Sequence, residues 1–185
     1  SYCSSLTQIT IPSSVTIIGD YTFQECTSLT QIEFEIPSSV TMIKEAAFLN
    51  CKSLTQIIFP SSVTIIKERA FAFCESLSQV TFSFPSSLTD IENGAFFHCS
   101  FSQIEIPSYV TNIGQEAFSR CSSLKEITFE IPSSLAHIEY EAFHKCTSLT
   151  KITIPSSVTR IWIRNFSECS SLKKITFESP SFIYV

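Results

Sequence analysis

Cysteine is the residue type in this chain that could carry out the widest range of chemistry, and it recurs at a nearly fixed spacing. The eight cysteines follow one another at intervals of 22 to 25 residues: Cys3, Cys26, Cys51, Cys74, Cys99, Cys121, Cys146 and Cys169. Thiols can form disulfides or bind zinc, but structural zinc sites use Cys or His pairs only a few residues apart. From Cys26 on, each cysteine closely follows a phenylalanine that we expect to be buried. The pattern favours reduced, buried thiols acting as small apolar side chains, with an occasional disulfide as the alternative, and predicts no metal and no cofactor.

Residues for acid–base or nucleophilic catalysis do not gather in this sequence. The three histidines, His98, His137 and His144, lie at variable positions of the repeat, and Asp20 and Asp90 are the only aspartates. The chain has only three glycines, too few and too far apart for a glycine-rich phosphate loop. We therefore predict that the chain is not an enzyme.

A column of glutamines is the first candidate binding surface. Glutamine occupies the second position after the leucine of five repeats, at Gln8, Gln31, Gln56, Gln79 and Gln103. Stacked amides can hydrogen-bond to one another along the axis of a repeat protein, which would be a purely structural role. The alternative is a polar protein-binding surface flanked by Glu33 and Glu35. The sequence leaves these two interpretations open.

A short apolar stripe is the second candidate surface. Ile17, Met42 and Ile65 occupy the position before the recurring Ile of a second β segment, where later repeats carry polar residues. Flanking residues such as Val15 and Ile18 are expected to point inward, which sends this position outward. Exposed contiguous apolar area often marks a contact site. Either a partner protein or neighbouring loop residues then cover the stripe.

One phrase runs through the whole chain and predicts its architecture: Leu-x-x-Ile-x-Ile-Pro-Ser-Ser-Val-Thr-x-Ile, then Ala-Phe and Cys. A fixed period in the range of about 20 to 50 residues is typical of stacked repeats. Alternation in residues 6–12 predicts a strand that ends at Pro12, followed by a Pro-Ser-Ser turn. A second short β segment and a helical or irregular turn complete the unit. Residues 1–185 are thus expected to form a single solenoid of seven to eight rungs.

The repeats alternate between 23 and 25 residues, and we assign the two extra residues to the first strand. Because side chains alternate with a period of two, such an extension keeps the apolar face inward. Ile32, Phe34 and Ile36 are then inside, with Glu33 and Glu35 outside. Phe84 and Ile131 are expected to point inward in the same way.

Seven phenylalanines at equivalent positions are predicted to stack as a buried column: Phe23, Phe48, Phe71, Phe96, Phe118, Phe143 and Phe166. Repeats run to both ends without a polar cap, so we expect the chain to be a segment of a longer protein. Uncapped terminal rungs would permit end-to-end contacts.

Composition narrows the possible partners. The net charge of −5 gives no basic footprint for nucleic acid. The charge is uneven, because residues 1–119 carry 4 basic and 11 acidic groups, whereas residues 120–185 carry 8 and 6. No apolar run approaches the roughly 18 residues needed to cross a bilayer, so no direct membrane insertion of this segment is expected.

The repeat resembles the BspA-like (Treponema pallidum type) subclass of leucine-rich repeats over the entire chain, since Pro, Phe and Cys recur in register. The resemblance implies a right-handed solenoid with a parallel β-sheet on its concave face. It also implies a role like that of surface proteins of bacteria and protists, which attach to host proteins or cells. One departure concerns the Gly after the recurring Ile, which survives only at Gly19 and Gly114. A position that needs positive φ would resist such replacement, so we expect no conformational need for Gly there.

These observations predict a non-catalytic, protein-binding repeat module. Adhesion at a cell surface, or after secretion, is the favoured role. The alternative is an intracellular structural or scaffold component of a large assembly, cytoplasmic and associated with the cytoskeleton. Flanking sequence in the full gene, such as a signal peptide or an anchor, would distinguish the two.

Overall fold

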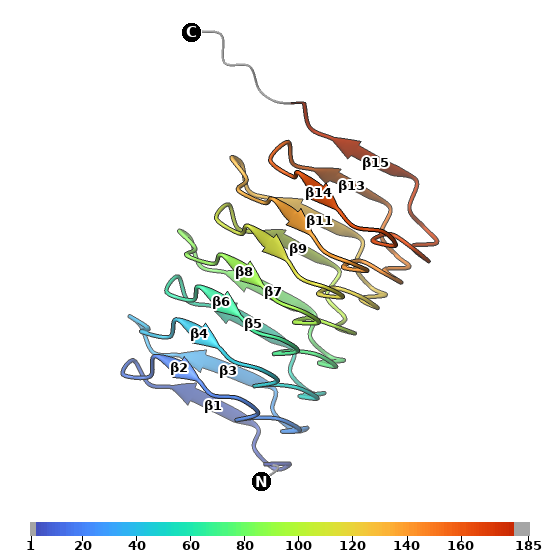
Figure 1. Cartoon of the computed structure of the whole chain (residues 1–185). Helices are drawn as coiled ribbons and strands as arrows, with labels where there is room; N and C mark the ends of the chain where they lie inside the picture. The colour runs from blue at the N-terminus through green and yellow to red at the C-terminus, as the bar shows by residue number, and fades with distance from the viewer. Residues whose placement is uncertain (1–2, 180–185) are drawn as a thin grey trace, which may run out of the picture.

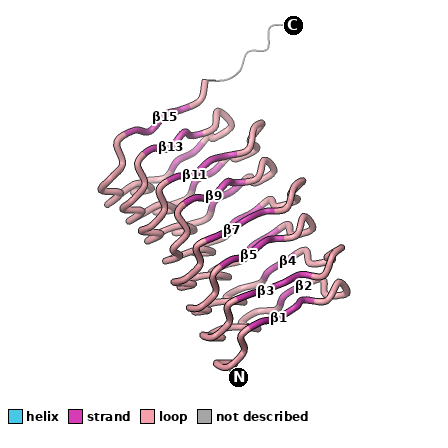
Figure 2. Tube along the Cα trace, turned by 180° about the vertical axis from the view of Figure 1, so that it is seen from behind, coloured by secondary structure: helices cyan, strands magenta, loops and turns pink. Residues whose placement is uncertain are grey.

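The computed structural model describes residues 3–179 as a stack of rungs, each one turn of a β-solenoid (Figure 1). This confirms the predicted fold class. Each rung begins with a four-residue strand: β1 (Gln8–Ile11), β3 (Gln31–Phe34), β5 (Gln56–Phe59), β7 (Gln79–Phe82), β9 (Gln103–Ile106), β11 (Glu126–Phe129), β13 (Lys151–Ile154) and β15 (Lys174–Phe177). We call the surface that these strands form the long-strand face; Figure 2 shows it toward the viewer.

Within residues 3–179, a two-residue strand follows the turn after each long-strand-face strand from β1 to β13: β2 (Ile17–Ile18), β4 (Met42–Ile43), β6 (Ile65–Ile66), β8 (Asp90–Ile91), β10 (Asn112–Ile113), β12 (His137–Ile138) and β14 (Arg160–Ile161). These strands pair in parallel as one continuous seven-stranded sheet, the short-strand face. The segment from there to the next cysteine consists of turns in every rung, with no helix in residues 3–179. We call these stacked turns the turn column.

The core is built around the predicted phenylalanine column, which the structure confirms. Consecutive rings from Phe23 to Phe166 are stacked with centroids 5.1 to 5.7 Å apart and interplanar angles of 2° to 13°. The five inner rings are fully buried, whereas Phe23 and Phe166 are half-buried at the ends of the column. Stacked rings at this spacing add to the apolar burial that joins one rung to the next.

The cysteines form a second column beside the rings. All eight are free thiols, and every one except Cys3 is buried. From Cys51 on, each Sγ donates to the carbonyl oxygen of the phenylalanine one rung earlier, over 3.1 to 3.3 Å. The thiol therefore contributes a hydrogen bond between rungs as well as apolar volume, which the sequence pattern did not reveal.

Main-chain hydrogen bonds between rungs hold the turn column together. The residue directly after a short strand, such as Lys44, donates to the rung before it, whereas the later residues of the turn donate to the rung after it. The N–H groups of Ala46, Phe48 and Asn50 donate to the carbonyls of residues 68, 70 and 72 in the next rung, at 2.8 to 2.9 Å. Two positions of each turn have φ near +55°, and Gly94 is the only glycine among them. Gly19 and Gly114 are not among these positions, so neither needs a positive φ. The expectation that glycine is not required is nevertheless wrong at Gly114, because a Cβ there would lie 2.7 Å from main-chain atoms of Glu92 and Asn93.

The assignment of the two extra residues to the strand is wrong. Strands β3, β7 and β11 keep four residues, and the extra residues form a loop after each strand. In this loop Ile36, Phe84 and Ile131 are 93%, 86% and 78% exposed instead of buried, and each precedes a cis proline bond. A longer strand would find no partner for its added residues, because the rung on either side is a short one.

The long-strand face is interrupted at every second step. Each short rung pairs fully with the long rung after it, as in Gln8↔Gln31 to Ile11↔Phe34. Between β3 and β5 only Gln31↔Gln56 pairs. Across β7/β9 and β11/β13 the described residues have no ladder pairing. We call these three interruptions seams; they leave main-chain N–H and C=O groups without a strand partner.

Candidate functional site

The predicted glutamine column lies on the long-strand face. Gln8, Gln31, Gln56 and Gln79 are in register from β1 to β7, and Gln103 pairs with Glu126. No amide–amide hydrogen bond joins them among the described residues; the Gln31 Nε2 donates to Glu33 Oε1 over 2.7 Å instead. The amides therefore remain accessible from solvent, as a binding surface requires.

Glu33 and Glu35 differ in their location and in the hydrogen bonds that their carboxylates accept. Glu33 lies on the exposed face of β3 beside Gln31. Glu35 lies in the loop after β3, where its carboxylate accepts a hydrogen bond from the main-chain N–H of Ser13 at 2.8 Å. Glu130 accepts the equivalent bond from Ser108 N–H at 3.0 Å. Two of the loops that follow long rungs are therefore tied to the preceding short rung, and Glu35 contributes to structure as well as to surface charge.

A groove of about 580 Å³ follows the seam between β3 and β5. Ile36 and Ile58, 93% and 53% exposed, provide its apolar surface together with Pro37 and Pro60. Ile58 is the only apolar residue at the second outward position of the eight long-strand-face strands, where the others carry Thr or Glu. An exposed apolar surface therefore lies next to unpaired main-chain groups.

The other two seams carry smaller grooves with different lining. The groove at β7/β9 has about 300 Å³ and is lined by Glu105, Glu126 and Glu130. The groove at β11/β13 has about 290 Å³ and includes Lys151, which forms an ion pair with Glu126 across the seam at 3.3 Å. The same backbone feature therefore recurs every second rung, with an apolar, an acidic and a mixed lining.

The apolar stripe lies on the short-strand face, on three neighbouring strands. Ile17, Met42 and Ile65 are in register across β2, β4 and β6. Ile17 is 46% exposed, whereas Met42 and Ile65 are half-buried. The stripe is thus continuous, and its exposed part is concentrated at Ile17.

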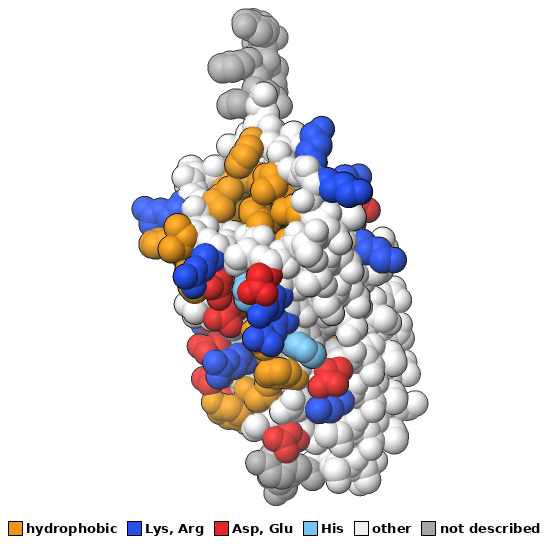
Figure 3. All heavy atoms as spheres, turned by 90° about the vertical axis from the view of Figure 1, so that its right-hand side faces the viewer, with side chains coloured by type: hydrophobic (Ala, Val, Ile, Leu, Met, Phe, Trp, Pro, Cys, Tyr) orange, Lys and Arg blue, Asp and Glu red, His pale blue; other side chains and the backbone are white. Residues whose placement is uncertain are grey.

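Charged side chains follow the turn column in pairs that join adjacent rungs. Lys44–Asp20, Lys67–Glu92, Lys145–Glu168 and Arg164–Glu141 have N···O distances of 3.3, 2.6, 3.4 and 3.7 Å. Figure 3 shows acidic and basic side chains along this face, with hydrophobic side chains between them. Such exposed pairs contribute little stability individually, about 0 to 1 kcal/mol, so they act mainly as a polar surface.

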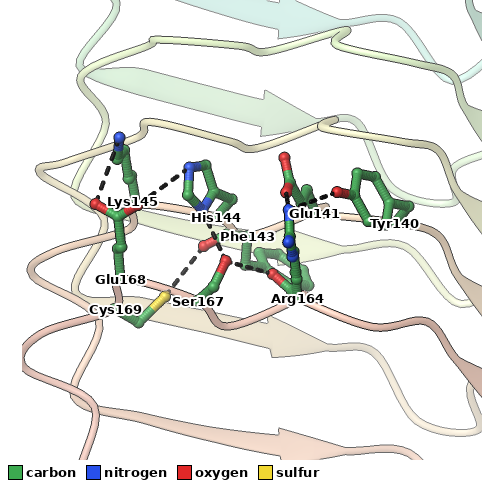
Figure 4. Close-up of polar contacts among 9 residues, drawn as sticks. All are labelled: Tyr140, Glu141, Phe143, His144, Lys145, Arg164, Ser167, Glu168 and Cys169. Carbon is green, nitrogen blue, oxygen red and sulfur yellow. Dashed lines mark hydrogen bonds and ion pairs between the residues drawn. The ribbon is translucent and has the colours of Figure 1, made fainter.

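One cluster on the turn column has the residue types of a catalytic triad but not the arrangement. His144 Nδ1 is 2.8 Å from Ser167 Oγ, and His144 Nε2 is 3.8 Å from Glu168 (Figure 4). The Ser167 hydroxyl donates to the carbonyl of Arg164 at 2.9 Å, so its proton is not directed to the imidazole. The carboxylate is too far for a hydrogen bond that would orient the ring. The cluster therefore joins two rungs through hydrogen bonds and ion pairs.

Burial controls the chemistry of the thiols. Desolvation raises the pKa of Cys51 and of Cys121 to about 12, because the thiolate would lie among apolar side chains. Such thiols are poor nucleophiles and poor metal ligands at neutral pH. Within residues 3–179, no group of three or more His, Cys, Asp or Glu side chains is arranged to hold a metal ion.

Comparison with known proteins gives a consistent result. A family model described as BspA type leucine rich repeat region matches six copies, over residues 1–125 and 89–184. The chain is similar to the solved leucine rich repeat protein of T. pallidum, with 29% identity and a TM-score of 0.65 over 93% of this chain and 68% of that one. It is also similar in fold to a leucine rich cell surface protein from Faecalibacterium prausnitzii, with 24% identity and a TM-score of 0.51 over 95% and 80% of the two chains. No curated protein sequence matches.

Proposed function

Because the chain belongs to the BspA-type leucine-rich repeat family, we propose that it is a non-catalytic module that binds an extended segment of a partner protein on its long-strand face. The repeat fold supports this role, since stacked rungs present a long surface from a rigid backbone. The part of the structure that is described has no helix long and apolar enough to span a membrane.

The seam between β3 and β5 is the observation that carries the proposal. It combines the two features by which extended segments are recognised, main-chain groups without a strand partner and pockets for side chains. Only Gln31↔Gln56 pairs across this seam, and the groove beside it exposes Ile36 and Ile58. The side-chain amides of Gln31 and Gln56 line the same groove and offer both donors and acceptors.

Charge specifies the chemistry of the partner. Strands β1, β3, β5, β7 and β9 contain Glu33 and Glu105 and no Lys or Arg. The expected ligand is a segment with a bulky aliphatic or aromatic side chain flanked by Lys or Arg. The acidic face would accelerate encounter with such a segment and weaken binding as salt is raised.

Selection from a phage library of random dodecapeptides tests the proposal. We expect the chain to enrich peptides of that composition, and the double variant Ile36→Ser/Ile58→Ser to bind them at least tenfold more weakly. Ile131→Ser is the matched control, because Ile131 is 78% exposed in the equivalent loop of a later rung and does not line the β3/β5 groove. Selection of no common composition, or equal binding by the double variant, would contradict the proposed site.

We include adhesion at a cell surface in the proposal, with an intracellular scaffold as the alternative. The similar protein from F. prausnitzii is described as a leucine rich cell surface protein. A signal peptide or a membrane anchor encoded next to these repeats would favour adhesion, and fluorescence microscopy of the tagged full-length protein would locate it directly. Staining confined to the cytoplasm would favour the scaffold.

End-to-end contact between copies is a lesser part of the proposal. On the outermost described strand, β15, Ile175 and Phe177 are 40% and 64% exposed, whereas Ile152 and Ile154 at the equivalent positions of β13 are buried. A second chain stacked on this strand would cover both side chains. Light scattering over a range of protein concentrations measures the association, and a constant monomer mass would contradict it.

A further inference from the structure

A second groove lies on the turn column, away from the long-strand face, and arises from two small residues in neighbouring rungs. It has about 510 Å³ and extends from Asn50 to Glu116. Gly94 stands where the adjacent rungs carry Arg69 and Glu116, and Ala72 stands where they carry Leu49 and Phe97. The missing side-chain volume at these two positions leaves the column hollow between larger neighbours.

An exposed aromatic wall borders this groove. Phe73 is 36% exposed, and its ring contacts that of Phe97 edge-on with centroids 5.2 Å apart. Phe73 has φ of 59°, a left-handed conformation that is costly for a bulky residue. The other rungs place polar residues at this position: Glu25, Asn50, His98, Arg120, Lys145 and Glu168. The Phe73 ring also lies 5.6 Å from the His98 ring, centroid to centroid, and part of its surface faces solvent.

Polar side chains, most of them amides and carboxylates, surround the aromatic wall. Asn50, Asn93 and Gln115 provide three amides, and Glu68 with Glu116 adds two carboxylates beside one guanidinium, that of Arg69. The amides are only partly engaged within the protein: Asn93 Oδ1 accepts from the Gln115 N–H at 2.9 Å, and Gln115 Nε2 donates to Glu116 at 3.3 Å. Further donors and acceptors therefore remain for a ligand.

The main chain beneath this groove is mostly hydrogen-bonded to the next rung, unlike that of the seams. The N–H groups of Asn50, Arg69, Phe73 and Gly94 each donate to a carbonyl in the next rung at 2.8 to 2.9 Å. An extended peptide would find no open strand edge here. A purely apolar ligand would bury the amides without partners, and an anion would meet two carboxylates.

We propose that this groove binds a neutral oligosaccharide. A sugar hydroxyl both donates and accepts, which matches amide and carboxylate side chains, and the C–H face of a pyranose fits the negative face of an aromatic ring. The groove spans three rung steps, roughly 14 Å at the spacing of stacked strands, so it accommodates linked sugars. The site lies beyond the proposed protein-binding seam and shares no residue with it.

Binding to an array of defined neutral, amino-sugar and sialylated oligosaccharides tests this proposal, followed by calorimetric titration of the strongest ligand. The decisive variant is Phe73→Asn, because Asn50 holds the same position one rung earlier with φ of 61° and the fold should therefore tolerate it. We expect neutral glycans to bind the wild-type chain and to lose at least tenfold affinity for Phe73→Asn. Gln115→Ala should also lower the affinity for neutral glycans.

Lys145→Asn is the matched control, because Lys145 occupies the equivalent turn position with φ of 59° and lies outside the groove. It should bind glycans as the wild type does, and so should Ile36→Ser/Ile58→Ser, which separates this site from the seam. Equal melting temperatures establish that the variants fold. Absence of any glycan that binds wild type more tightly than Phe73→Asn would overturn the proposal. So would a preference for sialylated ligands, or loss of the phage-selected peptides on Phe73→Asn.

Discussion

The thiol of Cys99 donates a hydrogen bond to the carbonyl oxygen of Phe71 over 3.1 Å, from one rung to the rung before it. The same contact recurs from Cys51 to Cys169, so the cysteine column forms a line of hydrogen bonds parallel to the stack of phenylalanine rings. Sulfur is a weak donor, but the carbonyl it meets is buried and has a second lone pair to satisfy.

Accessibility of the thiols gives the first prediction. Iodoacetamide at a pH near 8 should alkylate Cys3, the exposed cysteine, and leave the seven buried ones unmodified until the chain is denatured. Mass spectrometry of the intact protein counts the labels before and after denaturation. Rapid labelling of several sites in the folded chain, or a mass that indicates disulfides, would contradict the buried column of free thiols.

Alkaline pH should destabilise the fold. The pKa of Cys51 and of Cys121 is raised from 9.0 to about 12 by burial, so the folded chain holds these protons more tightly than the unfolded chain. Stability is therefore full below about pH 9 and falls as pH rises toward 12, by up to about 1.4 kcal/mol per pH unit for each such thiol. Urea unfolding at pH 8 and pH 10.5 measures the change. A Cys51→Ala variant should show a smaller decrease; an identical decrease would assign the effect to other groups.

Replacement of Phe96 by Ala should cost about 3 to 5 kcal/mol of unfolding free energy. Its ring is fully buried between Phe71 and Phe118, with centroids 5.6 Å from each. Phe84→Ala is the control, since Phe84 is 86% exposed, and it should change stability by no more than about 0.5 kcal/mol. Chemical denaturation of both variants provides the comparison, and equal effects would be incompatible with the described register.

The left-handed positions of the turn column allow a stabilising substitution. Glu25 has φ of 57°, and its N–H donates to the carbonyl of Leu49 in the next rung. Glycine adopts this conformation without steric cost, so Glu25→Gly should stabilise the chain by up to about 1 kcal/mol. Gln24→Gly, at the neighbouring position, should instead destabilise it. Thermal unfolding distinguishes the two, and a lower melting temperature for Glu25→Gly would refute the assigned backbone conformation.

The apolar stripe remains a prediction about binding. Changing Ile17, Met42 and Ile65 together to Ser should leave the solenoid folded and weaken capture of a partner that uses the short-strand face. Because Met42 and Ile65 are half-buried, each of these two substitutions should also lower the free energy of unfolding by about 1 kcal/mol or more. Circular dichroism must therefore accompany the binding assay. Unchanged partner binding by the folded triple variant would count against a functional stripe, as would loss of folding.

Much of the core could be predicted from the sequence because every rung carries the same residue types at the same core positions. Phe96 and Cys99 recur in register, and only a buried column explains two such residues at a fixed distance. The location of Ile36 could not be predicted in this way, because a two-residue insertion keeps the alternation whether it lengthens the strand or loops out. The neighbouring rungs decide, since β1 and β5 offer no partners for two further residues.

The candidate sites depended even more on relations between rungs. The seam groove follows from the exposure of Ile36 and Ile58 together, and the sequence had placed Ile36 in the core. The groove on the turn column exists because Gly94 and Ala72 are both small, although they lie 22 residues apart in the chain. An alignment of the rungs shows other small residues at the same positions, such as Ala46 and Ser119, so only the structure reveals that Gly94 and Ala72 line one groove between larger neighbours.

The hydrogen bonds between rungs make the two faces of each rung chemically different. Ala46, Phe48 and Asn50 donate toward the rung that follows, whereas Lys44 donates to the rung before it, so the two faces of a rung present their donors and acceptors at different positions. Copies that met at their ends would therefore align head to tail. A contact of that kind is heterologous and builds rings or growing filaments, whereas a closed two-fold dimer would need a side face of the solenoid.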